Sequence, residues 1–220
     1  MKFFVNESLY DDVGQVLARM GQGFEYEPAE RYTSVPPTDA VLFLNCGGAV
    51  NASAPELASF IEKGGTIYAS DLQATFIAEM FPSVFGCTTR ARSGVFNASV
   101  VDQALKDTMG DDIDLKFDMG FWQYVTPKDR ADGKTHVYLH YRTFLGRCVP
   151  LVVSYDHPQG GSLFFTAFHN SAQKTKKEEE LLRFLLFRPI MSRNLQEIRQ
   201  DISETCTRPS TPFSRCTNAP

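Results

Sequence analysis

The sequence predicts an α/β fold in which helices flank a mostly parallel central sheet, with an antiparallel hairpin at one side. The runs 41–44 and 66–69 are apolar on both faces, which is typical of interior strands of a parallel sheet. Segments with helix-capping residues and an apolar stripe alternate with these runs. The apolar runs 149–155 and 162–168 flank a tight turn at 156–161 and predict the hairpin.

The first elements are a short strand and a capped helix. The strand is predicted at 3–5, and Ser8 with Asp11 forms a capping signature for a helix over 13–20. A second capping box, at 53–56, opens the helix that leads to the centre of the fold.

The stretch 62–77 is the centre of the predicted fold. The glycine pair at 64–65 ends a helix, the strand 66–69 follows, and Ser70 with Asp71 precedes a new helix. Ligands bind at the carboxyl ends of the strands in open parallel sheets. Ser70 and Asp71 therefore occupy the position where a functional site is expected.

The segment 83–148 has a less regular pattern, and we interpret it as an insertion or edge region beside the main sheet. It predicts a helix over 99–109 and alternating strands at 113–117 and 137–141. The aromatic run 120–124 is expected to form part of an edge hairpin.

Residues 1–190 are expected to form a single α/β domain, since the chain can bury one sizeable core. A capping box at 175–178 opens its last helix, which ends at Pro189. An amphipathic terminal helix is predicted at 191–204. The remaining residues, 205–220, have little to bury and predict a flexible tail.

Composition excludes several classes of protein. The formal net charge of −4 argues against a broad basic surface that binds nucleic acid. No apolar run approaches the ~20 residues that cross a bilayer, so we expect no membrane association and a cytoplasmic location. The chain has neither GxGxxG nor GxxxxGK[ST], and we expect no nucleotide or other cofactor.

Three segments together resemble the class I glutamine amidotransferase-like, flavodoxin-like superfamily, and its ThuA-like branch in particular. Segment 39–48 is similar to the strand and Gly-Gly loop that form the oxyanion hole, and segment 64–71 to the strand that leads to the nucleophile elbow. Segment 160–169 is similar to the late strand that ends on the triad histidine. The resemblance implies a flavodoxin-like fold with a site at these loops.

The catalytic residues of that family are degenerate here. Ser70 stands where the family has a cysteine nucleophile, and a thiolate is the group that the chemistry needs. The acidic residue expected two places after His169 is Ser171, which leaves no evident carboxylate to orient the imidazole. We therefore expect no glutaminase activity by the mechanism of the family.

Our preferred interpretation is a catalytically inactive amidotransferase-like domain that serves as a ligand-binding or assembly module in a cytosolic complex. The partner would be a protein or a small molecule, and the oligomeric state is left open. The predicted ligand-binding residues all lie in the loops that follow two neighbouring strands: Asn45, Cys46, Gly47, Gly48 and Asp71.

The alternative interpretation is a hydrolase. Ser70 would be the nucleophile, His169 its base, and the amides of Gly47 and Gly48 the oxyanion hole. Against this, Ser70 or Asp71 could simply cap the next helix, because serine and aspartate are common capping residues.

Other candidate residues have structural explanations. Cys46 is expected to pack as a small buried hydrophobe. His136 and His140 share a strand face but lie roughly 13 Å apart, too far to bind one zinc ion. The sequence therefore assigns no metal ligands. The aromatic run 121–124 either packs an edge hairpin or stacks on a base, a sugar or a partner.

Overall fold

The structure is a computed structural model that describes residues 1–20, 24–128 and 133–186. In chain order its strands are β1 (Lys2–Val5), β2 (Tyr26–Pro28), β3 (Ala40–Leu44), β4 (Thr66–Ser70), β5 (Phe85–Arg90), β6 (Gly94–Val100), β7 (Asp112–Phe117), β8 (Trp122–Pro127), β9 (Lys134–Arg142), β10 (Cys148–Asp156) and β11 (Ser162–Thr166).

The α-helices are α1 (Val13–Met20), α2 (Ala54–Glu62), α3 (Ala74–Met80) and α4 (Gln103–Met109), and a further helix is described from 176 to 186. Short 3-10 helices are η1 (Ala29–Ser34), η2 (Pro37–Asp39) and η3 (Asp71–Gln73). The predicted terminal helix at 191–204 and the tail at 205–220 lie outside the described residues.

The parallel part of the main sheet has the order β2, β1, β3, β4, β11. β3, β4 and β11 are buried along their whole length, as expected for parallel strands with both faces covered. β1 pairs with β3, and β3 with β4. This pairing confirms that the predicted strands 3–5, 41–44 and 66–69 lie side by side.

The rest of the main sheet is antiparallel. From β11 it continues through β10, β9, β6 and β7, so the predicted hairpin is confirmed at one side of the parallel strands. The segment 83–148 supplies β9, β6 and β7 to this outer part of the sheet. Its other strands, β5 and β8, form a separate antiparallel pair.

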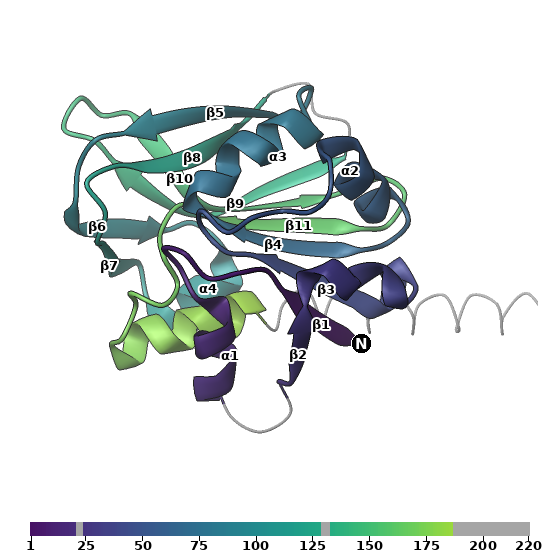
Figure 1. Ribbon diagram of the computed structural model, residues 1–220. Helices are drawn as coiled ribbons and strands as arrows, with labels where there is room; N and C mark the ends of the chain where they lie inside the picture. The colour runs from purple at the N-terminus through teal and green to yellow at the C-terminus, as the bar shows by residue number, and fades with distance from the viewer. Residues whose placement is uncertain (21–23, 129–132, 187–220) are drawn as a thin grey trace, which may run out of the picture.

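Two layers cover the main sheet (Figure 1). α2 and α3 lie on one face together with the β5–β8 pair, and α1, α4 and the helix from residue 176 lie on the other. The architecture is therefore the α/β class that the sequence predicts, with a mostly parallel centre between helices.

The predicted helix over 99–109 is wrong in its first turn, because the helix begins only at Gln103. Ser99 and Val100 instead end β6, where Phe96, Ala98 and Val100 are buried and alternate with more exposed residues. Such an alternation is typical of a strand with one buried face. The hydrophobic period of this segment is thus two residues.

The capping boxes differ in outcome. The Ser53 amide donates to Glu56 Oε2 at 2.7 Å, and the Thr175 amide donates to Glu178 Oε2 at 2.6 Å, as predicted. The cap of α1 is predicted at Ser8 and Asp11, and this prediction is wrong. The side chain of Asp12 accepts from the Gln15 amide at 2.9 Å, and Asp11 bonds elsewhere.

Replacing Ile67 by alanine tests the assignment of β4 to the centre of the sheet. Ile67 is fully buried and stands in register with Leu42 of β3 and Leu163 of β11. Ile67→Ala is expected to lower the free energy of unfolding by about 2–5 kcal/mol in denaturant melts, since it removes buried methyl groups and leaves a cavity. Val95→Ala, on a residue of β6 that is 67% exposed, should change it by about 0.5 kcal/mol or less. Equal melts for the two variants would contradict this burial.

Candidate functional site

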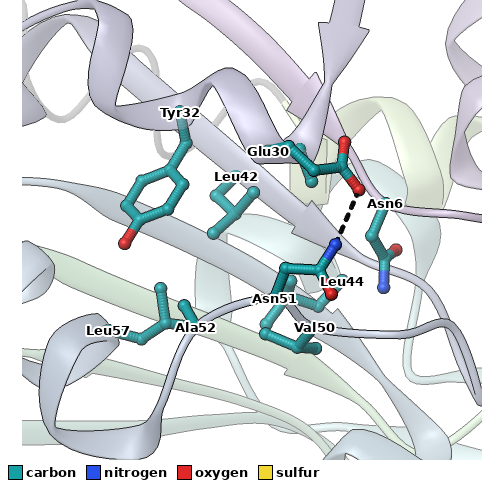
Figure 2. A pocket seen from close by; sticks show the side chains of 10 residues that line it. Asn6, Glu30, Tyr32, Leu42, Leu44, Val50, Asn51, Ala52 and Leu57 are labelled. Carbon is teal, nitrogen blue, oxygen red and sulfur yellow. Dashed lines mark hydrogen bonds between the residues drawn. The ribbon is translucent and has the colours of Figure 1, made fainter.

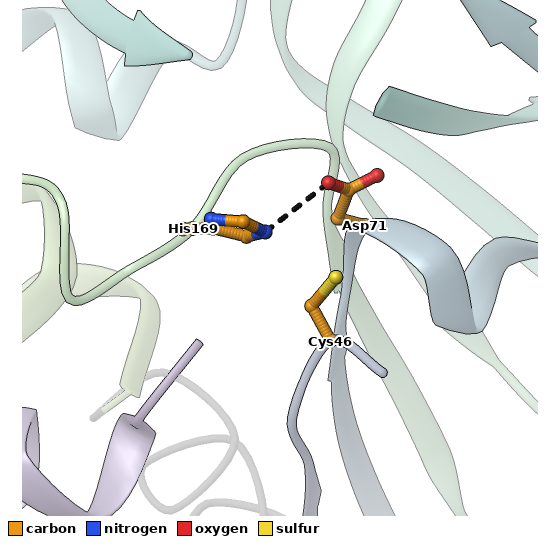
Figure 3. Close-up of side chains that lie close together, drawn as sticks. All are labelled: Cys46, Asp71 and His169. Carbon is orange, nitrogen blue, oxygen red and sulfur yellow. Dashed lines mark ion pairs between the residues drawn. The ribbon is translucent and has the colours of Figure 1, made fainter. Parts of the chain in front are cut away.

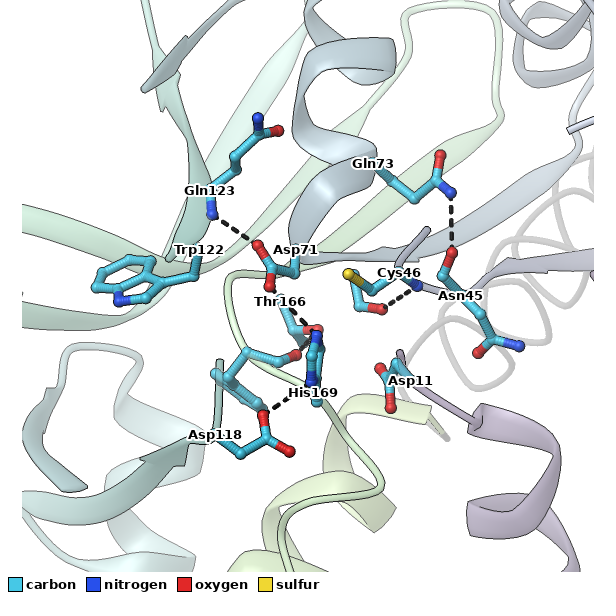
Figure 4. Close-up of polar contacts among 12 residues, drawn as sticks. Asp11, Asn45, Cys46, Asp71, Gln73, Asp118, Trp122, Gln123, Thr166 and His169 are labelled. Atoms are coloured by element: carbon cyan, nitrogen blue, oxygen red, sulfur yellow. Dashed lines mark hydrogen bonds and ion pairs between the residues drawn. The ribbon is translucent and has the colours of Figure 1, made fainter. Parts of the chain in front are cut away.

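The loops that follow β3, β4 and β11 meet at the carboxyl edge of the parallel strands (Figure 4). Parallel pairing sends all three loops to the same edge. They bring together Asn45, Cys46, Asp71 and His169, which are all buried. The site is thus built from three segments that are far apart in the sequence.

Asp71 occupies the sharp turn after β4. Its φ of 43° makes it the single non-glycine residue with positive φ in the part of the chain that the structure describes. Such a backbone conformation is strained for a residue with a Cβ and is often found at functional sites. Ser70, which the resemblance placed at this turn, instead ends β4 in extended backbone with φ −130°.

Ser70 is the N-cap residue of η3, but its side chain makes no capping hydrogen bond, and no side chain caps α3. Ser70 Oγ accepts a hydrogen bond from the Cys46 amide at 3.1 Å. Asp71 Oδ1 accepts one from the Gln123 amide at 2.6 Å. Both side chains therefore join β4 to neighbouring segments.

His169 lies between two carboxylates. Its Nε2 is 3.3 Å from Asp71 Oδ2, and its Nδ1 is 2.8 Å from Asp118 Oδ1. The side chain is only 2% exposed, yet neither nitrogen meets its carboxylate at a hydrogen-bonding angle. The contacts are therefore close ion pairs with poor hydrogen-bond alignment.

Asp118 corrects the expectation that no carboxylate orients His169. The family pattern places an acidic residue two positions after the histidine, where this chain has Ser171. The carboxylate comes instead from the residue that follows β7, at the antiparallel end of the main sheet. A sequence signal for it does exist, because Asp118 directly follows a strand with clear alternation, but its proximity to His169 depends on the sheet order.

The buried groups of this site shift one another's pKa values. Burial alone lowers the pKa of His169, but the Asp71 carboxylate and the Cys46 thiol outweigh it and raise that pKa well above its usual value. Burial raises the pKa of Cys46, and the Asp71 charge adds to that effect while His169 opposes it. The three groups therefore form one electrostatically coupled cluster.

Hydrogen bonds within the Gly47-Gly48 loop and from Gln73 hold this loop in place, and the ring of Tyr10 lies against it. The Gly48 amide donates to the Asn45 carbonyl oxygen at 3.1 Å. Gln73 Nε2 donates to the carbonyl oxygens of Asn45 (2.8 Å) and Gly48 (3.1 Å). Gly47 has φ 72°, and a Cβ there would lie 2.5 Å from the ring of Tyr10. The loop thus matches the expected position, with its Gly48 amide already bonded within the loop.

Asn45 anchors α1 to the same edge. Its Oδ1 accepts from the Val13 amide at 2.9 Å, and its Nδ2 donates to the Asn6 carbonyl oxygen at 3.1 Å. The amide of Asn45 also donates to Asn6 Oδ1 at 2.6 Å. These bonds engage both Oδ1 and Nδ2 of Asn45, a residue that the sequence predicts to bind a ligand.

Asp11 holds the loop that carries His169. Its carboxylate is buried and accepts from the Asn170 amide (3.0 Å), Asn170 Nδ2 (2.9 Å) and the Ser171 amide (2.9 Å). The sequence predicts Asp11 as part of a helix cap, because capping and long-range loop binding use the same residue type. The position of His169 therefore depends on a residue near the N-terminus.

The remaining candidates lie outside this cluster. His136 Nε2 is 2.9 Å from Asp102 Oδ2. Trp122 is buried, and its ring centroid lies 4.4 Å from that of Phe117, so packing explains this member of the aromatic run. Phe121 is 45% exposed.

A small pocket lies beside β3 and the loop that follows it (Figure 2). Asn51 Nδ2 donates to Glu30 Oε1 across it at 3.1 Å. Its volume is about 80 Å³, far below the roughly 300–1,000 Å³ of drug-sized ligand sites. The lining residues are Asn6, Ala29, Glu30, Tyr32, Leu42, Leu44, Val50, Asn51, Ala52 and Leu57.

Cys46, Asp71 and His169 bring three different ligand-type atoms together (Figure 3). One sulfur, one carboxylate oxygen and one ring nitrogen all lie within 4.8 Å of one another. The sequence predicts no metal ligands, because these residues show no recognisable spacing along the chain. Their proximity arises only from the parallel pairing of the strands.

Comparisons with known proteins show the fold. The sequence matches no protein-family model and no curated protein. Among solved structures, a candidate GMP synthase subunit from Thermoplasma acidophilum is 17% identical, with a TM-score of 0.56, over 90% of this chain and 98% of that one. The N-terminal domain of mmIFT52 is 11% identical, with a TM-score of 0.60, over 86% and 96% of the two chains.

A third solved structure is a candidate ThuA-like protein from Bacteroides uniformis. It is 10% identical, with a TM-score of 0.59, over 84% of this chain and 89% of that one. The fold is thus the class I glutamine amidotransferase-like, ThuA-like fold that the sequence segments suggest. Within the described residues, no helix has the length and apolar character needed to span a membrane.

Replacing Asp11 by alanine tests whether this residue holds the His169 loop. Asp11→Ala leaves the buried amide of Asn170 and the part-buried amide of Ser171 without their acceptor, so the free energy of unfolding should fall by roughly 2–5 kcal/mol. Asp107→Ala, on an exposed residue of α4, should lower it by about 0.5 kcal/mol or less. Denaturant melts measure both, and a loss for Asp11→Ala as small as that of the control would contradict the role of the residue.

Proposed function

We propose that this chain is a catalytically inactive amidotransferase-like domain that acts as a ligand-binding or assembly module in the cytosol. The observation that supports it best is the residue in the turn after β4. Glutaminase chemistry needs a cysteine thiolate there, and this chain has Asp71. The carboxylate is already engaged by the Gln123 amide and by His169.

The oxyanion loop supports the same proposal. An oxyanion hole needs backbone N–H groups that point at the reacting oxygen. Here the Cys46 amide donates to Ser70 Oγ, and the Gly48 amide donates to the Asn45 carbonyl oxygen. A reacting carbonyl would have to displace these bonds. The loop is therefore better suited to holding the site rigid than to stabilising a transition state.

A hydrolase that uses Ser70 and His169 is the second candidate, and Asp118 favours it. A nucleophile and its base are usually oriented by a third group, and Asp118 lies 2.8 Å from His169 Nδ1. Against it, Ser70 Oγ is completely buried and accepts from the Cys46 amide, and His169 Nε2 faces the Asp71 carboxylate. The inactive module is thus the better supported of the two.

The partner of the module is a protein or a small molecule in this proposal. The formal net charge of −4 disfavours nucleic acid, whose phosphates require clustered cations. The pocket beside β3 has room for about 80 Å³, too little for a nucleotide or sugar. That pocket is therefore not the binding site of such a ligand.

Activity measurements on the purified protein test the proposal. We expect no ammonia release from glutamine, and no adduct of a serine-directed phosphonate at Ser70 by peptide mass spectrometry, because the nucleophile is neither exposed nor activated. A Ser70→Ala variant controls for labelling of other hydroxyl groups. An adduct at Ser70 that disappears in His169→Ala would overturn the module and establish the hydrolase.

A further inference from the structure

We propose that Cys46, Asp71 and His169 bind one divalent transition-metal ion, with zinc the best match. The inference rests on the proposed function and names the ligand of that module. It starts from the cluster in Figure 3, in which all three residues are buried and offer a sulfur, an oxygen and a nitrogen within 4.8 Å of one another.

The spacing of the donors suits a tetrahedral ion. Zinc binds nitrogen and oxygen at about 2.0–2.2 Å, so two such ligands of one tetrahedral ion lie roughly 3.3–3.6 Å apart. Asp71 Oδ2 and His169 Nε2 are 3.3 Å apart. A small movement of the Cys46 side chain would complete the set, which leaves a fourth position for water or a ligand.

The Nε2 atom of His169 could accept a better partner than the one it has. This nitrogen is buried, and its contact with Asp71 Oδ2 at 3.3 Å does not meet hydrogen-bond geometry within the described residues. Buried polar atoms of native proteins nearly always have a partner. Nε2 faces Asp71 beside the Cys46 sulfur (Figure 3), which is where a metal ion would supply that partner.

Neighbouring residues orient two of the ligands. Metal-binding histidines commonly present their other ring nitrogen to a carboxylate, and Asp118 Oδ1 lies 2.8 Å from His169 Nδ1. The Gln123 amide donates to Asp71 Oδ1 at 2.6 Å, which leaves Oδ2 directed at the histidine. The contacts that would orient His169 and Asp71 as metal ligands are therefore present.

The local charge favours a cation. Asp71 and Asp118 flank the ring, and in the described part of the chain neither carboxylate forms an ion pair with a lysine or arginine. A mixed set of thiolate, imidazole and carboxylate suits zinc or cobalt, whereas magnesium and calcium prefer oxygen ligands alone. This set of donor atoms therefore favours a transition-metal ion such as zinc or cobalt over magnesium or calcium.

Cobalt titration of the full chain tests the site. Protein without a histidine tag is dialysed against EDTA and titrated with Co²⁺ alone. We expect saturation at one equivalent, with a sulfur-to-cobalt charge-transfer band and the visible absorption of a tetrahedral ion, and displacement of both by Zn²⁺. Absence of any such band in the wild-type protein would overturn the proposal.

Matched variants assign the band to Cys46. It should vanish in Cys46→Ser and persist in a variant that carries serine at the other four cysteines, Cys87, Cys148, Cys206 and Cys216. The reverse pattern would place the metal elsewhere and overturn the site. Asp118→Asn should keep the band and weaken cobalt affinity by roughly 10–100-fold, an effect that stands even if Cys46→Ser fails to fold. Unchanged affinity in Asp118→Asn would contradict the proposed role of that carboxylate.

The metal site and the inactive-module proposal can be contradicted independently of each other. An inactive protein that binds no cobalt would overturn the metal site and leave the module standing. A protein that binds cobalt but forms a phosphonate adduct at Ser70 would overturn the module and leave the metal site standing.

Discussion

The contact between Asp71 and His169 is the interaction on which the carboxyl edge of the sheet depends. Asp71 can reach the histidine because its backbone adopts a φ of 43° immediately after β4. The same carboxylate accepts from the Gln123 amide of β8, so one side chain joins the main sheet, the β5–β8 pair and the loop after β11. Local backbone strain is tolerated here because the surrounding contacts over-determine the turn.

Asp11 and Asp118 complete this arrangement, one from the parallel part and one from the antiparallel part of the main sheet. Asp11 follows β1 in the parallel part and binds the amides of Asn170 and Ser171. Asp118 follows β7 at the antiparallel end and contacts the ring of His169. The histidine is thus held by carboxylates from distant parts of the chain.

The parallel core could be predicted from sequence because each of its central strands has a local signal. Runs such as 41–44 and 66–69 are apolar on both faces, and in a parallel sheet their carboxyl ends must share an edge. That reasoning brings Cys46 and Asp71 to one edge, and the resemblance of segment 160–169 to the late strand that ends on the triad histidine adds His169. The capping boxes at 53–56 and 175–178 were predictable for the same reason, since they are contacts within one turn of chain.

The rest of the site could not be predicted, because it depends on pairing between distant segments. Asp118 reaches His169 only through the order of the antiparallel strands, which the pattern of 83–148 does not encode. Ser70 and Asp71 are neighbours, so an error of one residue decides which of them is placed in the turn. Either residue type is compatible with the local sequence. Asp11 resembled a cap because its local neighbours are those of a helix start.

A double-mutant cycle of Asp71→Asn and His169→Gln tests most directly whether these two residues act as one buried unit. The free energy of unfolding is measured in denaturant for the metal-free wild type, both single variants and the double variant. We predict that the summed losses of the single variants exceed the loss of the double variant, with a coupling energy of roughly 0.5–3 kcal/mol. Losses that add within about 0.3 kcal/mol would contradict this coupling.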